Sequence, residues 1–200
     1  MVQVQYNSGF SSSISVFVRE VDSQKAAWLL NRKELFYGVQ DTSLGPCMVF
    51  LLDKAICALS LLMRKDEAQV LEEFMRRWPG LIIRECRDVA KEALGRVFDI
   101  WEEGGDSKVE LLLRGTPFQL RVWRALLTLP RGTTTSYQEI ACSVGCPLAV
   151  RAVGQAVGRN PVALLVPCHR VCYKNGAVGG YHWGSECKKR LLAKEGASFV

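Results

Sequence analysis

The chain has 200 residues, of which 48% are hydrophobic, which is enough for one large domain or two small ones with a buried core. No apolar run approaches the ~18 residues of a membrane helix, and the first residues show neither the basic nor the apolar stretch of a secretory signal. Eight cysteines at irregular spacing argue against a disulfide framework and favour free thiols in a reducing compartment.

The net charge of +6 is distributed unevenly along the chain. Residues 115–200 contain 11 Lys and Arg against 3 Asp and Glu, a balance of +8, whereas residues 1–114 contain 15 against 17, a balance of −2. A basic half beside a nearly neutral one suggests a polyanionic partner, and nucleic acid is the first candidate. A solvated basic surface is the alternative that charge alone leaves open.

The first half has the pattern of an α/β structure. Alternating residues predict a strand over Ser13–Val21, and three β-branched or aromatic runs joined by short turns predict an antiparallel meander. These three runs are Glu34–Gln40, Cys47–Asp53 and Ala55–Leu62. An amphipathic helix is expected to follow, capped by Asp66 and ended by Pro79-Gly80, and a second one from Asp88 to about Trp101.

A polar passage separates the two halves, with a short strand expected at Val109–Leu113. We therefore expect an α+β fold with two domains. Residues 1–108 would form an α/β supporting domain with a small antiparallel sheet, and residues 109–200 a mainly helical domain containing a helix-turn-helix.

The helical half opens at Thr116-Pro117, an N-cap followed by proline at the first helical position. Further on, Ser136 caps a short helix over Tyr137–Cys142, and a turn leads to a second helix from Pro147 to about Val157. Two short helices with a glycine in the turn fit a helix-turn-helix, although many helical hairpins share this pattern.

The second of these helices carries few side chains able to contact base edges. Its small residues are Ala149, Ala152 and Gly154, and its long polar ones are Arg151 and Gln155. Small residues permit close approach either to another helix or to a narrow DNA groove without sequence readout. The basic charge of this half and the motif described next favour the groove.

The chemistry is concentrated in "LLVPCHRV", Leu164–Val171. A buried-looking, strand-like run ends at a proline, and Cys168, His169 and Arg170 follow. A thiolate is the reactive form of cysteine, and a neighbouring base and cation lower the pKa of the thiol. Cys168 is therefore the candidate nucleophile, with the other cysteines read as small buried hydrophobes.

Two other chemistries compete for the same residues. A zinc site would need four ligands, but there is no CxxC pair, and His169 and His182 are the only histidines, so we expect no metal. A cysteine hydrolase would bring its base from a distant segment, and His182 is the only such candidate. If His169 lies in extended backbone beside Cys168, it points away from the thiol, so a bridging water is expected between them.

Three passages together resemble the O6-alkylguanine-DNA alkyltransferase (methylated-DNA–protein-cysteine methyltransferase) family. They are "PCHRV", the preceding "SYQEIA…RAVGQAVGRNP", and the following "GAVGGYHWG…KKRLLAKEGA". The resemblance is specific over roughly Gly115–Ala197, and the first half resembles the family's supporting domain only in outline. It implies direct repair of DNA. A helix-turn-helix docks in the minor groove, the alkylated guanine is flipped out, and a cysteine accepts its alkyl group once and irreversibly.

The resemblance assigns roles by position. Cys168 matches the acceptor, His169 the base acting through water, Glu195 the acid that orients the histidine, and Tyr137 the phenol that assists departure of guanine. Arg151 matches the residue that fills the gap in the stack. Ala149, Ala152 and Gly154 match the DNA-facing surface. Asn160 matches the residue that ties the recognition helix to the active-site loop, and Val171, Val178 and Tyr181 match the pocket.

The resemblance also implies a partner and a setting. We expect double-stranded DNA containing O6-alkylguanine, with O4-alkylthymine as a further substrate, bound by a monomer without sequence preference and without a cofactor. The location would be intracellular, cytoplasmic in a prokaryote and nuclear in a eukaryote. A repair-deficient lesion-binding relative is the remaining alternative, but such relatives lack the acceptor cysteine that this chain has.

Overall fold

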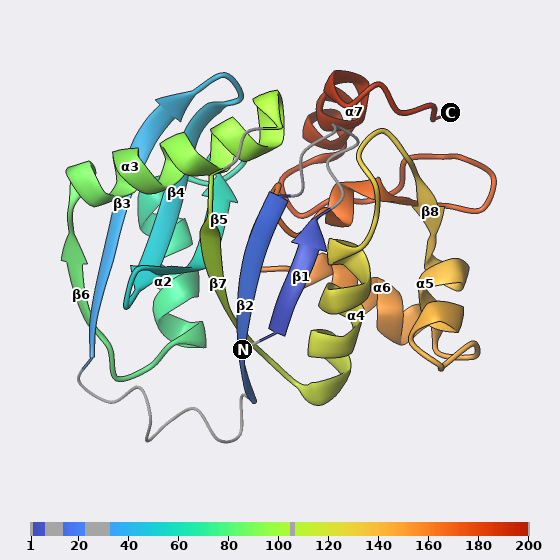
Figure 1. Ribbon diagram of the computed structural model, residues 1–200, viewed down its shortest axis with the longest axis horizontal. Coiled ribbons are helices and arrows are strands. Elements are labelled where there is room, and N and C mark those ends of the chain that lie inside the picture. Colours follow the sequence, from blue (N-terminus) through green and yellow to red (C-terminus); the bar gives the residue numbers. More distant parts are fainter. Residues whose placement is uncertain (1, 7–13, 23–32, 105–106, 200) are drawn as a thin grey trace.

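The computed structural model describes residues 2–6, 14–22, 33–104 and 107–199 (Figure 1). The strands are β1 (Val2–Tyr6), β2 (Ile14–Asp22), β3 (Glu34–Thr42), β4 (Gly45–Leu52), β5 (Ala55–Leu61), β6 (Ile82–Glu85), β7 (Val109–Gly115), β8 (Thr135–Ser136) and β9 (Val171–Cys172). The α-helices are α2 (Glu67–Arg77), α3 (Arg87–Phe98), α4 (Pro117–Leu127), α5 (Tyr137–Ser143), α6 (Val150–Gly158) and α7 (Ser185–Lys194). A π-helical turn, η1 (Asp99–Glu103), extends α3, and a 3-10 turn, η2 (Cys168–Arg170), carries the cysteine motif. None of the helices in the described ranges is long and apolar enough to cross a membrane.

The first half is built on a seven-stranded sheet of order β1-β2-β7-β5-β4-β3-β6. The predicted meander is confirmed, because β3, β4 and β5 pair antiparallel in sequence. The prediction of a small antiparallel sheet is wrong, since β2 and β5 pair parallel with β7, and β3 pairs parallel with β6. The reason is that α2 and α3 connect β5 to β6 and β6 to β7, and such helical crossovers place strands parallel.

Strand β4 is continuously apolar because both of its faces are buried. Its alternate residues contribute to two separate buried clusters, one under α3 and one under α2. The residues on the α3 side are Cys47, Val49 and Leu51, and those on the α2 side are Met48, Phe50 and Leu52. Figure 1 shows α3 in front of the sheet and α2 behind it. A strand with one face in solvent alternates polar and apolar residues. A strand covered on both faces, such as β4, is apolar at every position.

The predicted helix starts are confirmed at three positions. Asp66, Thr116 and Ser136 each accept a hydrogen bond from the backbone N–H three residues later, as N-caps of α2, α4 and α5. The helix predicted from Asp88 begins one residue earlier and passes into the π-helical turn. Ser13, where the first strand was predicted to begin, lies outside the described residues.

Helix α6 begins later than the proline-based prediction. Gly145, with φ 72°, ends α5, and the N–H of Ala149 then bonds the carbonyl of Cys146 in a further turn. Pro147 lies in that turn rather than at the first helical position, so the helix starts at Val150. The two helices and their connecting turn nevertheless have the predicted order.

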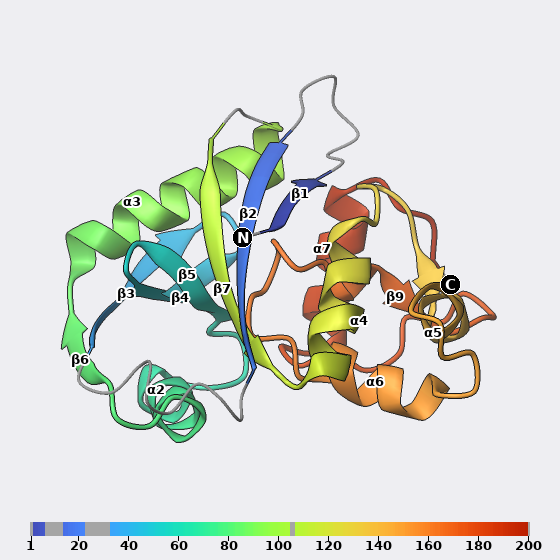
Figure 2. The ribbon, with the colours of Figure 1, turned by 60° about the horizontal axis from the view of Figure 1, so that its bottom comes forward.

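The two halves share a core. β7 lies inside the sheet, so the chain passes to the helical layer only after Gly115, later than the boundary expected before residue 109. One buried cluster joins sheet residues such as Leu59 and Leu111 to residues of α4, α6 and the segment before Cys168. Figure 2 shows α4 and the other helices of the helical half on the side of the sheet where β1, β2 and β7 lie. The sheet is therefore in direct contact with the elements that carry the motif.

Candidate active site

The segment before Cys168 does not form the strand that its apolar run suggested. Val162 makes one isolated parallel bridge to Leu59 of β5, and Leu164 adopts the left-handed region with φ 65°. The N–H of Leu59 bonds the carbonyl of Pro161, and the N–H of Ala163 bonds the carbonyl of Leu59. The run is apolar because it is wholly buried as a folded loop against the sheet, a case that periodicity alone does not separate from a buried strand.

Asn160 holds this loop together from the end of α6. Its side-chain oxygen accepts from the N–H of Val162 at 3.0 Å, and its Nδ2 lies 3.1 Å from the Val162 carbonyl and 2.7 Å from that of Val166. The same nitrogen lies 3.0 Å from Sγ of Cys168. The side chain of Asn160 therefore lies between the end of α6 and the thiol.

The Cys168 thiol is almost fully buried, at the first position of the 3-10 turn. Burial raises its pKa to about 11, while Asn160, Lys188 and Tyr181 act in the opposite direction. The resting side chain is therefore a thiol, and a base has to remove its proton before it can act as a strong nucleophile.

His169 and Glu195 form a fully buried pair. Nε2 of His169 lies 2.9 Å from Oε1 of Glu195, and both side chains have no exposed surface. Arg170 adds two hydrogen bonds, from Nε to Oε2 at 2.9 Å and from Nη2 to Oε1 at 2.8 Å. Burial alone would raise the pKa of Glu195, but the hydrogen bonds and charges of His169 and Arg170 outweigh it and hold the pKa well below the usual range.

This arrangement fixes the histidine tautomer. An ionised carboxylate only accepts hydrogen bonds, so Nε2 of His169 carries the proton and Nδ1 has a free lone pair. Nδ1 is buried and has no hydrogen-bond partner among the described residues. Burial lowers the pKa of His169, with Arg170 and Lys188 acting in the same direction against Glu195. A neutral imidazole with a free Nδ1 is ready to accept a proton.

The cysteine borders a cavity of about 850 Å³ between α5, α6 and the loop after β9. Five of the predicted site residues line it, namely Tyr137, Arg151, Gly154, Cys168 and Tyr181. The other predicted residues do not: His169, Glu195, Asn160, Val171 and Val178 are buried behind the cavity. Ala149, the N-cap of α6, and Ala152 within that helix lie outside its lining.

Two aromatic side chains of the cavity keep their hydroxyl protons. Burial raises the pKa of Tyr137, and nearby Tyr173, Cys172 and Cys168 add to that effect. The pKa of Tyr181 is raised well above its ordinary value, chiefly by burial and by the neighbouring Cys168. Protonated phenols beside the thiol are available to donate hydrogen bonds to a bound group.

Helix α6 separates its packing residues from its small surface residues. Val153, Ala156 and Val157 are buried, whereas Arg151 and Ala152 are exposed. A Cβ built on Gly154 would lie 3.8 Å from the Tyr137 ring, which is ordinary contact rather than a clash. At Gly154, therefore, the packing of Tyr137 leaves room for a methyl group.

Lys188, a fully buried lysine of α7, is not among the residues predicted from the sequence. Its Nζ bonds the carbonyl of Val171 at 2.5 Å and also bonds the carbonyl of Val178. It thus joins the two ends of a loop whose Tyr173 and Lys174 line the cavity, and burial lowers the pKa of the lysine. A lysine in "ECKKRLL" looks like part of a solvated face, and no sequence signal separates it from exposed Lys189.

Metal-ligating side chains do not gather in the described part of the chain, where no group of three or more His, Cys, Asp or Glu could hold an ion. The site has instead the features of a protein with a single buried cysteine nucleophile, a histidine base oriented by a carboxylate, and an open cavity beside a pair of short helices. Comparison with known proteins specifies this class further.

Residues 117–197 match the family model for the DNA binding domain of 6-O-methylguanine DNA methyltransferase. The chain is 41% identical over 132 residues to the inducible methylated-DNA–protein-cysteine methyltransferase of Bacillus subtilis, covering 66% of this chain and 74% of that protein. It is 36% identical over 160 residues, 80% of this chain, to the bifunctional transcriptional activator/DNA repair enzyme Ada of Escherichia coli, but spans only 45% of that protein's length.

The fold is also similar to that of solved structures. The crystal structure of Mycobacterium tuberculosis OGT in complex with DNA superposes with a TM-score of 0.64 at 35% identity, covering 80% of this chain and 92% of that one. This chain belongs to the methylated-DNA–protein-cysteine methyltransferase family.

Proposed function

We propose that this protein repairs O6-alkylguanine in DNA by transferring the alkyl group, once and irreversibly, to Cys168. The observation that carries the proposal is the buried thiol at the cavity, backed by a histidine whose Nε2 is held by Glu195 and whose Nδ1 is free. Family membership supports the same reaction, and O4-alkylthymine is a further substrate of the same chemistry.

The chemical step follows from these groups. Through a water molecule, Nδ1 of His169 takes the proton of the Cys168 thiol, and the thiolate attacks the saturated carbon of the alkyl group. The sulfur–carbon bond forms as the bond from carbon to O6 of guanine breaks, and the electron pair passes to the base. Tyr137 donates a hydrogen bond to the departing guanine and lowers the cost of its developing negative charge. The thioether has no easy hydrolysis route, so each molecule acts once.

DNA is bound through α5 and α6 used as a helix-turn-helix. The small residues at the start and on the surface of α6, exposed Ala152 and partly exposed Ala149 and Gly154, fit close approach to the minor groove, and Arg151 fills the stack vacated by the flipped base. Apart from Arg151 and Gln155 this surface has no long polar side chains to read base edges, so binding is independent of sequence. The protein acts as a monomer, inside the cell where its DNA substrate lies.

The test is intact mass after incubation with a duplex containing O6-methylguanine. We expect the gain of one methyl group, mapped by peptide analysis to Cys168, and no gain in a Cys168→Ala variant that retains DNA affinity. Unchanged mass in the wild type would favour a lesion-binding module instead, and turnover of a small ester would favour a hydrolase. Methylation of the Cys168→Ala variant would move the acceptor elsewhere, with Cys172 the nearest candidate in sequence.

A further inference from the structure

Glu195 has a third donor on the oxygen that holds His169, and it comes from the other half of the molecule. The indole Nε1 of Trp101 lies 3.2 Å from Oε1 of Glu195. Trp101 is 1% exposed and belongs to η1, the π-helical turn that follows α3. Oε1 therefore accepts from Trp101, His169 and Arg170 together, while Oε2 accepts from Arg170.

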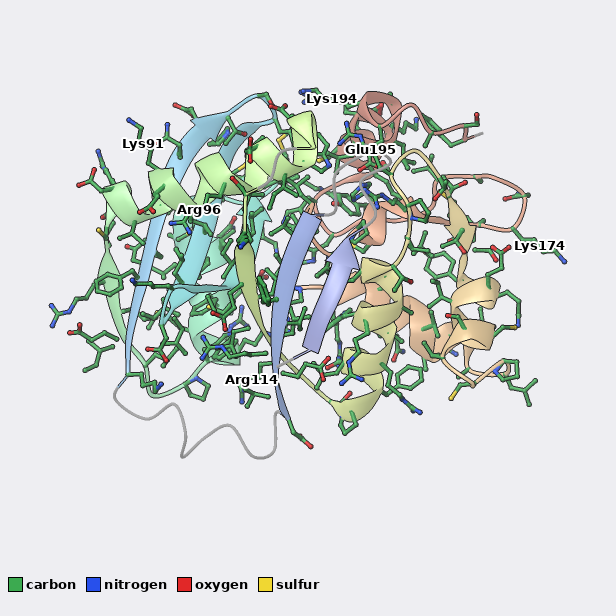
Figure 3. All side chains as sticks on the ribbon, viewed as in Figure 1. Lys91, Arg96, Arg114, Lys174, Lys194 and Glu195 are labelled. Atoms are coloured by element: carbon green, nitrogen blue, oxygen red, sulfur yellow. The ribbon has the colours of Figure 1, made fainter. Side chains whose placement is uncertain are left out.

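The Trp101 ring is held in place from several sides. The Arg131 guanidinium lies 5.5 Å from the ring centroid and also bonds the Trp101 carbonyl. The Lys194 ammonium lies 5.7 Å from the ring centroid and 3.3 Å from Glu102 in the same turn. In Figure 3, Lys194 and Glu195 lie together where the end of α7 meets the end of α3. Cations over an indole face withdraw electron density from the ring, which strengthens its N–H as a donor.

Other buried indoles make a different kind of contact. Nε1 of Trp123 donates to the carbonyl of Ala156, and Nε1 of Trp183 donates to the hydroxyl of Ser60. Both acceptors are neutral. Among the described tryptophans, only Trp101 donates to a carboxylate, and that carboxylate holds the histidine. A π-helical turn shifts the helical register by one residue, and such turns are frequent at functional sites.

We propose that Trp101 is a positioning residue for alkyl transfer, supplied by the sheet half to complete the donor set of Glu195. Its N–H fixes Oε1 and takes a share of the carboxylate charge, so that His169 keeps its Nε2–H tautomer yet stays neutral. This inference rests on the proposed function for its effect on rate. The hydrogen-bonded link itself makes predictions that do not require any activity.

The first experiment follows the histidines by NMR. With only two histidines in the chain, selective ¹⁵N labelling yields two imidazoles, and a His182→Ala variant assigns them. In Trp101→Phe the carboxylate loses a donor and offers more charge to His169, so the pKa of His169 should rise by roughly half a unit. Trp183→Phe is the matched control, since it also removes a buried indole N–H, and should leave His169 unchanged. Equal pKa values of His169 in wild type and Trp101→Phe, or an equal rise in the control, would overturn the proposal.

The second experiment measures single-turnover methyl transfer against pH. The acid limb of the profile should move upward with the pKa of His169, making Trp101→Phe about threefold slower on that limb and nearly equal to wild type at high pH. In a Glu195→Gln background the same substitution should not move the acid limb, because the carboxylate charge that Trp101 shares with His169 is absent. A uniform loss at every pH would indicate a merely structural role.

Two readouts keep the inference separate from the proposed function and from misfolding. If the wild type methylates nothing, the proposed function fails while the NMR result still decides whether Trp101 acts on His169. If Trp101→Phe does not fold, the wild-type indole proton of Trp101 serves instead. It should titrate with the same midpoint as His169, because both bond one oxygen, and an indole signal indifferent to that titration would refute the link.

Discussion

The two halves of the molecule place their polar groups in opposite ways. In the described part of the sheet half, charged side chains form surface pairs such as Lys33–Asp53 and Arg84–Glu34, and the buried cluster under α2 is apolar. The helical half buries the polar and charged residues of the described core, namely Ser136, Asn160, His169, Arg170, Lys188 and Glu195. Buried charges are costly to desolvate, so their concentration around one thiol indicates that this half is built for chemistry as well as for stability.

The halves are nevertheless coupled at the site. The loop before Cys168 bonds β5 through Leu59, and the carboxylate of the helical half accepts from Trp101 of the sheet half. The sheet is thus the frame against which the buried loop before Cys168 and the carboxylate of Glu195 are fixed. Substitutions that compare the halves should show effects that depend on burial more than on residue type.

The largest effect is expected for Glu195→Gln. It removes the buried negative charge that His169 and Arg170 contact and places an amide where three donors converge, which should destabilise the fold by about 3–5 kcal/mol at neutral pH. Glu92→Gln, which removes the carboxylate of an exposed pair with Arg96, is the matched control in the sheet half and should cost under about 1 kcal/mol. Denaturant unfolding of both variants measures the difference.

Acid should reduce the difference in free energy of unfolding between wild type and Glu195→Gln. The folded pKa of Glu195 is held below its unfolded value, so its ionised form stabilises the fold above an unfolded pKa of about 4.3, and this contribution is lost as pH falls further. Burial also lowers the pKa of His169, so stability falls as pH drops below about 6.5, because the unfolded chain binds that proton more readily. A gap between wild type and Glu195→Gln that widens as pH falls below about 4.3 would contradict this assignment.

Tyr137→Phe should slow methyl transfer while leaving the fold intact. The ring still packs against Tyr173, at 5.8 Å between centroids, but the donor to the leaving guanine is removed. Loss of one such donor costs about 2.7–4 kcal/mol in well-organised oxyanion sites, which is the upper guide here. Tyr37→Phe, in the sheet half, removes a hydroxyl far from the reaction and should leave the single-turnover rate unchanged. Equal rates for Tyr137→Phe and wild type would remove Tyr137 from the chemical step.

Asn160→Ala should cost less, about 1–3 kcal/mol, because it leaves buried backbone groups of Val162 and Val166 without their side-chain partner. The exposed Asn175, whose side chain accepts from the N–H of Ala177, provides the control and should be nearly neutral as alanine. Thermal unfolding compares the two. Transfer should also be slower in Asn160→Ala, since the thiol loses a donor that favours its thiolate.

The parts of this structure that follow from sequence are those governed by local rules. The N-caps at Asp66, Thr116 and Ser136 and the meander of β3, β4 and β5 depend on a few adjacent residues. Sheet order does not, because the parallel pairing of β2 with β7 joins segments almost a hundred residues apart, which only tertiary packing decides.

The site divides in the same way. Cys168 and His169 are adjacent, and their motif is specific enough to find. Lys188 and Trp101 carry no local signal, because their hydrogen-bond acceptors are distant in the sequence. Lys188 donates to a backbone carbonyl and Trp101 to a carboxylate, and only the fold brings these groups together. The strand-like run before Cys168 misled because complete burial looks the same in a loop and in a strand.

The smallest effect is expected at one of two glycines, one in each half, that differ in the room around them. Gly38 of β3 lies beneath α3, where an added Cβ would come 2.8 Å from Cβ of Ala90 and 3.1 Å from the Cys86 carbonyl, so Gly38→Ala should destabilise by about 1–3 kcal/mol.

Gly154 lies mid-helix in α6 with room for a methyl group, so Gly154→Ala should stabilise the fold by about 0.5–1 kcal/mol through helix propensity. Because the proposed DNA-facing surface depends on small residues, that same variant should bind duplex more weakly despite its greater stability. Unfolding curves and duplex titrations at fixed salt test both halves of this statement. Unchanged affinity in the stabilised Gly154→Ala variant would show that α6 does not approach DNA closely at this position.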